Sequence, residues 1–385
     1  MKLKTTYIYD ALRTPRGKGK EGGALASLGP DDLVAALIDS IKKSTASELR
    51  PDALILGAVG QVGAQGGNIA LASKFRAGLP DATTAFALNN LCVSGLTAII
   101  QASAMVASGR AGTVLAGGVE MMSRVPFMAD KADFYTDSTL PARSRYLLVA
   151  LAADRLAEDL GISRQELDHA ALISQQASAA AEGTDLVASR ISVNGLDREE
   201  CLRVGTLESL GALEPAFGGD AKYYKDILGR DIDHRHTVAH APPISDGAGL
   251  ALVGVEGAVD AEPRARIVAC AEVGGDPAES LTAGFVAMER ALERAGLTLD
   301  DMDRIEFMEA FAVTIVKFMR DYEPSSEKVN VGGGHLAKGH PLGASGAILL
   351  SSLLDALDVA QGRYGIVVAG GAFGTGSAMI VERVS

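Results

Sequence analysis

Cys92 is the residue of this chain whose type and setting most directly predict covalent chemistry. It follows a short apolar run at residues 84–88 and precedes residues 97–106, in which apolar residues recur at helical spacing. A cysteine at such a strand-to-helix turn faces the free N–H groups and the positive dipole end of the helix, and both stabilise a thiolate. The sequence therefore predicts a Cys92 thiol with a lowered pKa. The alternative is a buried structural thiol, because free cysteines are among the most buried residues.

His340 is the second residue whose setting predicts chemistry. It lies in a glycine-rich stretch at residues 331–346, where glycines allow the backbone to approach a ligand closely and Pro341 stiffens the turn behind the histidine. An imidazole that faces Cys92 could take the thiol proton. A histidine in a glycine-rich loop is otherwise an ordinary solvated or capping residue, so the functional interpretation depends on its pairing with Cys92.

The elements around Cys92 predict an α/β half. Residues 1–9 are predicted to form a first strand, residues 10–17 a turn-rich loop, and Gly29–Asp32 the start of a helix with proline and acids in its first turn. Buried strands are expected at residues 54–59 and 112–118. Because such continuous apolar runs alternate with helices, we expect a mostly parallel sheet that is covered on both faces.

The last third of the chain repeats the plan of the first. A helix at residues 285–295 and strands at 304–309 and 365–371 correspond to elements of the first half, and His340 falls near the place of Cys92. Between the halves, residues 120–245 form an excursion from the sheet, with helices expected at 147–160 and from the capping box at Ser163–Glu166. The domains are therefore predicted as residues 1–119 completed by about 246–265, an inserted loop domain at 120–245, and residues 266–385.

Composition limits the classes of function. With 385 residues, 48% of them hydrophobic and 22% charged, the chain is predicted to be a packed globular protein of two or three subdomains. A net charge of −12 argues against nonspecific binding to nucleic acid or to an anionic membrane. No uninterrupted apolar segment is long enough to span a bilayer, and the N-terminus is unlike a signal peptide. The three cysteines have no metal-ligand spacing, and the sequence predicts a cytoplasmic protein without a metal site.

Seven stretches give the chain a family resemblance over essentially its whole length. They are Arg13–Pro15, Asn90–Leu96, Gly117–Phe127, Leu213–Phe217, Ser245–Ala248, Glu309–Ala312 and Gly339–Ala347. In type and order these stretches resemble the thiolases, the acetyl-CoA acetyltransferases and 3-ketoacyl-CoA thiolases. The resemblance implies a five-layered αβαβα fold of two duplicated halves. It also implies an inserted loop domain that binds coenzyme A, with acyl-CoA as substrate and no covalently bound cofactor.

The same resemblance implies roles for single residues. Cys92 is expected to carry the acyl group as a thioester, and His340 to activate it and to form part of an oxyanion hole. The N–H groups of Cys92 and Ala372 are expected to form a second oxyanion hole. Substrate or coenzyme A contacts are expected from Ala241, Pro242, Ala310 and Phe311.

Three departures from the family pattern set this chain apart. The second catalytic cysteine of thiolases is replaced by Gly370, and the Asn of their Asn-Glu-Ala-Phe motif is replaced by Met308. The loop at residues 239–242 loses a serine and gains His240. His240 or His335 is a possible substitute for the missing proton carrier, whereas Cys201 and Cys270 are expected to be structural.

The sequence leaves several functions open. The first is an acyltransferase that performs Claisen condensation or thiolytic cleavage through an acyl-Cys92 intermediate. The alternatives are a condensing enzyme with a single cysteine, an acyl transferase or hydrolase with a different acceptor, and a catalytically reduced coenzyme A-binding subunit with a partner protein. A homodimer through the sheet edge near residues 89–92 is expected, and a homotetramer is the alternative.

Overall fold

The computed structural model describes residues 3–45 and 48–384 and contains two similar α/β halves. Residues 1 and 2 of the expected first strand lie outside the described residues. The N-terminal half and the segment inserted into it contain β1 (Tyr7–Arg13), β2 (Gly17–Lys18), α1 (Pro30–Ser44), β3 (Ala53–Gly57), α2 (Ile69–Arg76), β4 (Thr84–Leu88), α3 (Ser94–Ala107), β5 (Thr113–Met121), α4 (Val149–Asp159), α5 (Arg164–Ala181), α6 (Leu207–Gly211), α7 (Lys225–Leu228) and β6 (Ser245–Gly254). The C-terminal half contains β7 (Ala265–Gly274), α8 (Ala283–Ala295), β8 (Arg304–Phe307), α9 (Ala312–Tyr322), α10 (His335–Lys338), α11 (Ser345–Ala360), β9 (Tyr364–Gly371) and β10 (Thr375–Arg383).

The strands follow the order β4-β3-β5-β6-β1-β7-β10-β9-β8, and β2 pairs with β6. Only the β3–β4, β3–β5 and β8–β9 pairs are parallel, and all other pairs are antiparallel. The expected mostly parallel sheet is therefore wrong. The antiparallel pairs are those of β6, which lies between β5 and β1, and those of β7 and β10. The strand β10 follows β9 after a short turn, so these two strands must run antiparallel.

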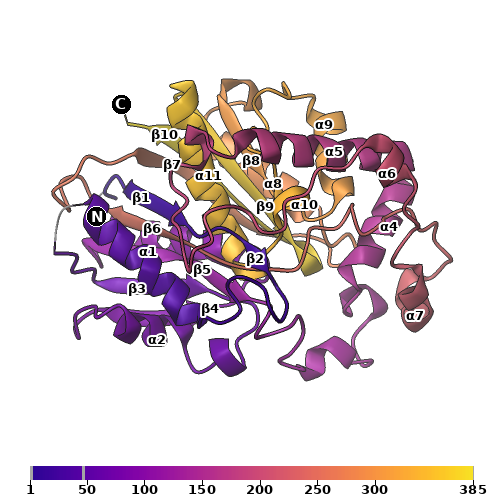
Figure 1. Ribbon diagram of the computed structural model, residues 1–385, viewed down its shortest axis with the longest axis horizontal. Helices are drawn as coiled ribbons and strands as arrows, with labels where there is room; N and C mark the ends of the chain where they lie inside the picture. The colour runs from indigo at the N-terminus through magenta and orange to yellow at the C-terminus, as the bar shows by residue number, and fades with distance from the viewer. Residues whose placement is uncertain (1–2, 46–47, 385) are drawn as a thin grey trace.

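Helices and strands alternate in five layers. The helices α3 and α11 contact each other, and between them they contact strands of both halves, so they form the central layer (Figure 1). On the outer faces, α1 and α2 pack on the N-terminal strands and α8 packs on β7, β9 and β10. The expected αβαβα arrangement is confirmed.

The strand β1 is displaced along the chain from the expected residues 1–9. The described residues 3–6 lie outside it, and it begins at Tyr7 and extends to Arg13. Asp10, Ala11, Leu12 and Arg13 pair with β6 instead of forming a loop. The charged residues of this strand are buried but satisfied: the Asp10 carboxylate accepts hydrogen bonds from the backbone N–H of Ala11 and from Ser44. Two charged residues within a short stretch are typical of a loop, and only the pairing with distant residues reveals the strand.

The expected helix starts are confirmed. At α1, the carboxylate of Asp32 accepts a hydrogen bond from the backbone N–H of Gly29 at 2.8 Å, and Pro30 occupies the first turn. At α5, Ser163 and Glu166 form the predicted capping box. Along its length α5 contacts α9 and α10 of the C-terminal half.

The inserted segment shares its core with the C-terminal half. The helices α4 and α5 contact α9, and Ala153, Ala157, Ile162 and Leu167 belong to the same hydrophobic cluster as Phe285. At the right of Figure 1 these helices lie beside α9 rather than apart from it. The inserted segment is thus packed against the C-terminal half.

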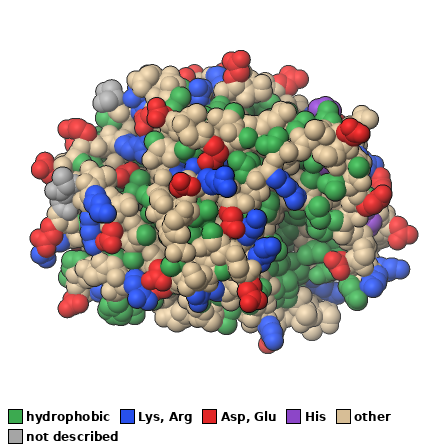
Figure 2. Space-filling view, viewed as in Figure 1, with side chains coloured by type: hydrophobic (Ala, Val, Ile, Leu, Met, Phe, Trp, Pro, Cys, Tyr) green, Lys and Arg blue, Asp and Glu red, His purple; other side chains and the backbone are tan. Residues whose placement is uncertain are grey.

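One segment, Leu342–Ala360, has the length and apolar composition of a membrane span, contrary to the sequence-based expectation. It comprises α11 and the turn before it, and 83% of it is buried inside the protein. Its apolar surface is covered by the strands of both halves, as expected for a central helix. Figure 2 shows acidic and basic side chains interspersed over one face of the molecule, and hydrophobic side chains gathered around a hollow.

Candidate active site

The two central helices cross where the loops that carry Cys92 and His340 end. A Cβ atom on Gly95 of α3 would lie 2.7 Å from the carbonyl oxygen of Gly343, and one on Gly346 of α11 would lie 2.6 Å from Cβ of Leu96. Side chains at these two positions would force the helices apart. Glycine at both crossing positions therefore allows the two helix starts, and the loops before them, to meet.

The turn before Cys92 is strained and held by side chains. Leu91 has a φ of +52°, which is uncommon for a residue other than glycine. The amide oxygen of Asn89 accepts a hydrogen bond from the Leu91 N–H at 2.9 Å. The hydroxyl of Ser94 accepts from the Asn90 N–H at 2.8 Å and donates to the Leu91 carbonyl at 2.6 Å. Ser94 thus bonds to the backbone on both sides of the turn, and the turn fixes the thiol at the helix start.

Cys92 and His340 line one cavity of about 390 Å³. Six more of the predicted site residues line it too: Ala241, Pro242, Ala310, Phe311, Gly370 and Ala372. The volume lies in the range of small-molecule sites, and the cavity wall is predominantly apolar. Among the described residues, no group of three or more His, Cys, Asp or Glu side chains could hold a metal ion.

The expected lowering of the Cys92 pKa is wrong for this structure. Burial, with a smaller contribution from the charge of Glu120, raises the pKa of the thiol to about 12. The backbone N–H groups of Ala372 and of Cys92 itself donate to the sulfur and act in the opposite direction. Desolvation prevails because the apolar cavity withdraws the sulfur from water, which a local sequence pattern does not reveal. At neutral pH Cys92 is therefore a thiol that needs a base.

His340 is in the neutral form that a base requires. Its Nδ1 lies 2.7 Å from Oγ of Ser345, and its backbone N–H donates to the carbonyl of Pro243. Burial, and next the charge of Arg16, lower its pKa to about 3, so the imidazole is neutral at pH 7. When Nδ1 carries the proton and donates it to Ser345, Nε2 is left free to accept the thiol proton.

A pH profile of alkylation tests this neutral pair. With a thiol pKa of about 12, the thiolate fraction rises tenfold per pH unit, so the rate of Cys92 alkylation by iodoacetamide should rise by about tenfold per unit from pH 7 to 10 without a plateau. Alkylation is followed by peptide mass spectrometry, which separates Cys92 from Cys201 and Cys270. A plateau that begins near pH 7 would show instead that Cys92 and His340 form a thiolate–imidazolium pair.

Met308 and His240 do not line the cavity. Met308 is buried in the central hydrophobic cluster. His240 is buried with Nε2 2.8 Å from Oδ1 of Asp168, and its Nδ1 accepts a hydrogen bond from the Thr237 N–H at 3.0 Å. With both ring nitrogens engaged away from Cys92, His240 has a structural setting. The structure therefore does not support it as a substitute for the missing proton carrier.

His335 lies behind His340 rather than in the cavity lining. The two rings meet edge to face, with centroids 5.1 Å apart, and neither nitrogen of His335 has a hydrogen-bond partner within the described residues. Cys270 lies on β7 and, like Cys201, is absent from the lining, so Cys92 is the only thiol among the described lining residues. Neither His335 nor another cysteine stands where the second thiolase cysteine would act.

Glu120 is a residue of this region that the sequence analysis did not single out. From the end of β5, its buried carboxylate accepts four hydrogen bonds: from the backbone N–H groups of Val59, Gly60 and Gly343, and from the side chain of Gln65. Gly343 belongs to the loop that carries His340. Glu120 therefore ties that loop to the N-terminal half.

One wall of the cavity, which was not predicted, is aromatic and is formed by Phe127, Tyr135, Tyr146 and Phe373. Tyr146 is its centre, with ring centroids 5.5 Å from Phe373, 5.6 Å from Tyr135 and 6.5 Å from Phe127. A sequence signal for this wall exists, because residues 127–146 hold four aromatic residues in a chain that is only 5% aromatic.

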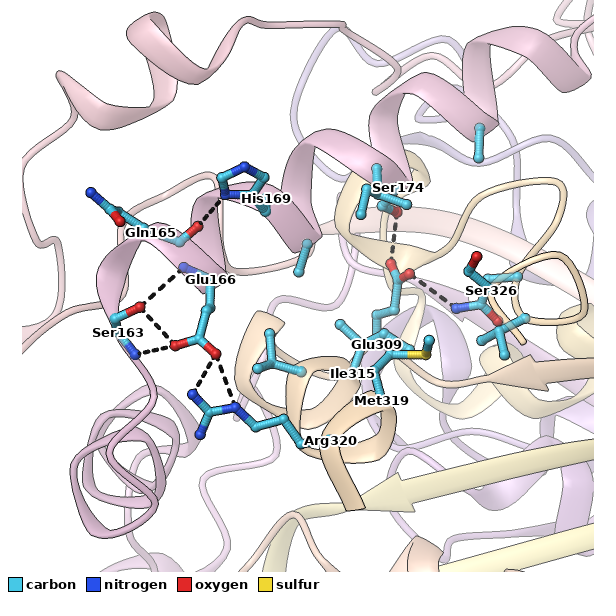
Figure 3. A pocket seen from close by; sticks show the side chains of 16 residues that line it. Ser163, Gln165, Glu166, His169, Ser174, Glu309, Ile315, Met319, Arg320 and Ser326 are labelled. Carbon is cyan, nitrogen blue, oxygen red and sulfur yellow. Dashed lines mark hydrogen bonds and ion pairs between the residues drawn. The ribbon is translucent and has the colours of Figure 1, made fainter. Parts of the chain in front are cut away.

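A second cavity, of about 570 Å³, lies between α5 and α9 and contains neither Cys92 nor His340 (Figure 3). At its floor the Glu309 carboxylate accepts hydrogen bonds from Ser174 at 2.7 Å and from Asn330 at 3.0 Å. At its rim Glu166 pairs with Arg320. These acidic side chains are paired, and among the described lining residues of this cavity there is no cysteine.

Comparisons with known proteins show the family of the chain. The model of the thiolase N-terminal domain matches residues 6–256, and that of the thiolase C-terminal domain matches residues 261–383. A beta-ketoadipyl-CoA thiolase of Acinetobacter baylyi is 34% identical over 99% of this chain and 100% of its own length. An acetyl-CoA acetyltransferase of Escherichia coli is 33% identical over the full length of both chains.

A crystal structure of the Bacillus anthracis acetyl-CoA acetyltransferase matches all of both chains with a TM-score of 0.84 and 27% identity. A steroid 3-ketoacyl-CoA thiolase of Mycobacterium tuberculosis is also similar, at 32% identity over 99% of this chain and 95% of its own length. Family models, relatives and fold all agree over nearly the whole sequence. The chain therefore belongs to the thiolase family and is an acyltransferase of that superfamily.

Proposed function

We propose that this protein cleaves 3-oxoacyl-CoA by thiolysis through an acyl-Cys92 intermediate, with His340 as its base. The observation that carries the proposal is the cavity that holds both side chains, in which the N–H groups of Cys92 and Ala372 point at the sulfur. Donors in that position can also stabilise an oxyanion on the carbon that the sulfur attacks.

The proposed reaction has two halves. In the first, Sγ of Cys92 bonds to the 3-oxo carbon as His340 takes the thiol proton, and the bond between C2 and C3 then breaks to release the enolate of acetyl-CoA. Because the lowered pKa of His340 makes its imidazolium a strong acid, it returns the proton to the enolate carbon. In the second half, the thiol of coenzyme A attacks the acyl-Cys92 thioester and gives its proton to His340. The bond from the acyl carbon to Sγ of Cys92 then breaks, the sulfur takes the proton from His340, and a shortened acyl-CoA is released.

Two observations favour a modified reaction as the second candidate. Gly370 lines the cavity without a side chain, and Met308 is buried away from it. A single thiol and a single base suffice to form and discharge an acyl-enzyme, so condensation, or transfer to a different acceptor, is the alternative fate of that intermediate. A catalytically reduced coenzyme A-binding subunit is a weaker candidate, since such a subunit needs neither Cys92 nor His340.

The direct test is an assay of 3-oxohexanoyl-CoA with free coenzyme A. The proposal expects stoichiometric butanoyl-CoA and acetyl-CoA, separated by chromatography. If acyl-Cys92 forms but coenzyme A does not discharge it, the second candidate replaces the first. If no acyl-enzyme forms and no product appears, the reduced subunit is the correct assignment.

The charges of the side chains that line the cavity favour a substrate with an apolar acyl group. Among the described lining residues no Lys or Arg is present, His340 is neutral, and Asp220 is the one acidic side chain. The relatives named for beta-ketoadipyl-CoA act on an acyl chain that ends in a carboxylate. A terminal carboxylate in this cavity would lack a cationic partner and would be repelled by Asp220.

We therefore expect thiolysis of 3-oxohexanoyl-CoA to exceed that of 3-oxoadipyl-CoA by about 10²-fold in kcat/KM, since an unpaired buried carboxylate costs several kcal/mol. The two substrates share a six-carbon chain and differ at its end, so the ratio isolates the charge. Equal values would contradict an apolar acyl site. Asp220→Asn should raise the rate with 3-oxoadipyl-CoA more than that with 3-oxohexanoyl-CoA.

We further propose a homodimer formed through the edge of the sheet near residues 89–92. The strand β4 ends the strand order, and the apolar side chains of Leu71, Phe75 and Phe86 are exposed on β4 and the adjacent α2. A homotetramer or a partner protein stays a prediction. So does the cytoplasmic location, with which the three free cysteines agree.

A further inference from the structure

Phe373 has a backbone conformation that is rare for a phenylalanine, and its ring lines the active-site cavity. Its φ is +56° and its ψ is +25°, in the left-handed region, where a bulky side chain is an outlier. Such strain persists only where the surrounding structure holds it, and it is concentrated at functional sites. The side chain is half-buried and belongs to the cavity lining. The strained residue therefore places a large ring beside the space for the substrate.

Hydrogen bonds hold the turn that carries Phe373. The N–H of Gly374 donates to the carbonyl of Ser280 at 3.0 Å. The hydroxyl of Thr375 donates to the carbonyl of Ala372 at 3.1 Å. Because the backbone is bonded on both sides of Phe373, the ring leaves it in one fixed direction.

The strand end before this turn lies against the nucleophile. At Gly371, two residues before Phe373, a Cβ atom would lie 3.4 Å from the backbone nitrogen of Cys92 and 3.5 Å from its Cβ. Coenzyme A is expected at residues 241–242 and 310–311, which are other segments of the lining. The acyl group on the sulfur is then left the part of the cavity that Phe373 lines.

The ring of Phe373 separates this part of the cavity from the surface. On the cavity side it packs against Tyr146, with ring centroids 5.5 Å apart. It also packs against Phe134 at 5.0 Å, and Phe134 does not line the cavity and is 44% exposed. Without the phenyl group of Phe373, the cavity would extend toward Phe134 and the solvent.

We propose that the Phe373 ring ends the acyl part of the cavity and limits the length of the acyl chain. A short chain fits between Cys92 and the ring, whereas a long chain would have to displace a ring that the turn and two aromatic neighbours hold. Because a packed site resists extra methylene groups, the protein should discriminate against long chains. The inference rests on the proposed function and narrows its substrate class to short-chain 3-oxoacyl-CoA.

Phe373→Gly removes the ring and suits the left-handed backbone. In the wild type, kcat/KM for 3-oxohexanoyl-CoA should exceed that for 3-oxododecanoyl-CoA by about 10²-fold, and the glycine variant should reduce this ratio at least about tenfold. Phe373→Leu keeps a large apolar side chain on the same strained backbone, so it should retain the wild-type ratio. The dissociation constants of the products, butanoyl-CoA and decanoyl-CoA, should change in the same sense when they are measured by isothermal titration calorimetry.

The results separate this inference from the proposed function. An unchanged ratio in Phe373→Gly, even with a lower rate for both substrates, would overturn the inference, because the ring would then only support the turn. An equal change of the ratio in Phe373→Leu would also overturn it. If the wild type turned over neither substrate, the proposed function would fail, and the two dissociation constants would still decide whether Phe373 limits the chain.

Discussion

Replacement of Cys92 by alanine is expected to lower thiolysis of 3-oxohexanoyl-CoA on the order of 10⁴-fold or more, since no other thiol lies among the described lining residues. The sulfur forms the covalent bond that divides the reaction into two easier halves, and His340 alone has no acyl acceptor to activate. The loss should appear in kcat, because the cavity that binds the substrate remains. Steady-state assays under saturating substrate measure it.

Cys270→Ala provides the matched control for this variant. Cys270 is a thiol of similar burial on β7, paired with Met379 of β10, and it does not line the cavity. Its removal should leave kcat within about twofold of the wild type. If Cys92→Ala retains activity, or if Cys270→Ala loses it, the assignment of the nucleophile is wrong.

Glu120→Ala is expected to lower the free energy of unfolding by about 3–5 kcal/mol. Its carboxylate is the acceptor for three backbone N–H groups, of Val59, Gly60 and Gly343, and for the side chain of Gln65. Alanine would leave these donors buried without an acceptor. Because Gly343 lies three residues beyond His340, a loss of activity should accompany the loss of stability. Urea unfolding followed by circular dichroism measures the first effect.

Two further variants define what the Glu120 carboxylate contributes. Glu120→Gln keeps one acceptor oxygen and removes the charge, so its loss of stability should be intermediate. Removal of the charge should also lower the pKa of Cys92, because Glu120 raises it, and alkylation of Cys92 should become faster at a given pH. Glu48→Ala, which breaks an exposed pair with Arg50, should leave stability unchanged. A stability of Glu120→Ala equal to the wild type would contradict this role.

Much of the fold could be predicted from short stretches of the sequence. The helices α1 and α5 carry their own start signals at Pro30 and Ser163. The repeated order of elements predicts the two halves. The direction of the strands could not be read in this way. Whether β6 lies antiparallel to β5 depends on the path of the inserted segment, which leaves no local pattern.

Some residues of the site could likewise be predicted from local patterns, and others could not. Cys92 and His340 were predicted because turn residues and glycines mark their loops, and the structure brings both into one cavity. The setting of Tyr146 and the four bonds of Glu120 arise from residues far apart in the chain, so no local motif carries them. The pKa of Cys92 was mistaken in direction because a helix start is visible in sequence, whereas the depth of burial that outweighs it is a property of the packed cavity.

The most direct test of the central claim is the mass of the Cys92 peptide after the protein is mixed with 3-oxohexanoyl-CoA in the absence of free coenzyme A. The account predicts a butanoyl group on Cys92, released acetyl-CoA in equal amount, and loss of the adduct when coenzyme A is added. An unmodified Cys92 while acetyl-CoA is released would contradict the acyl-enzyme mechanism.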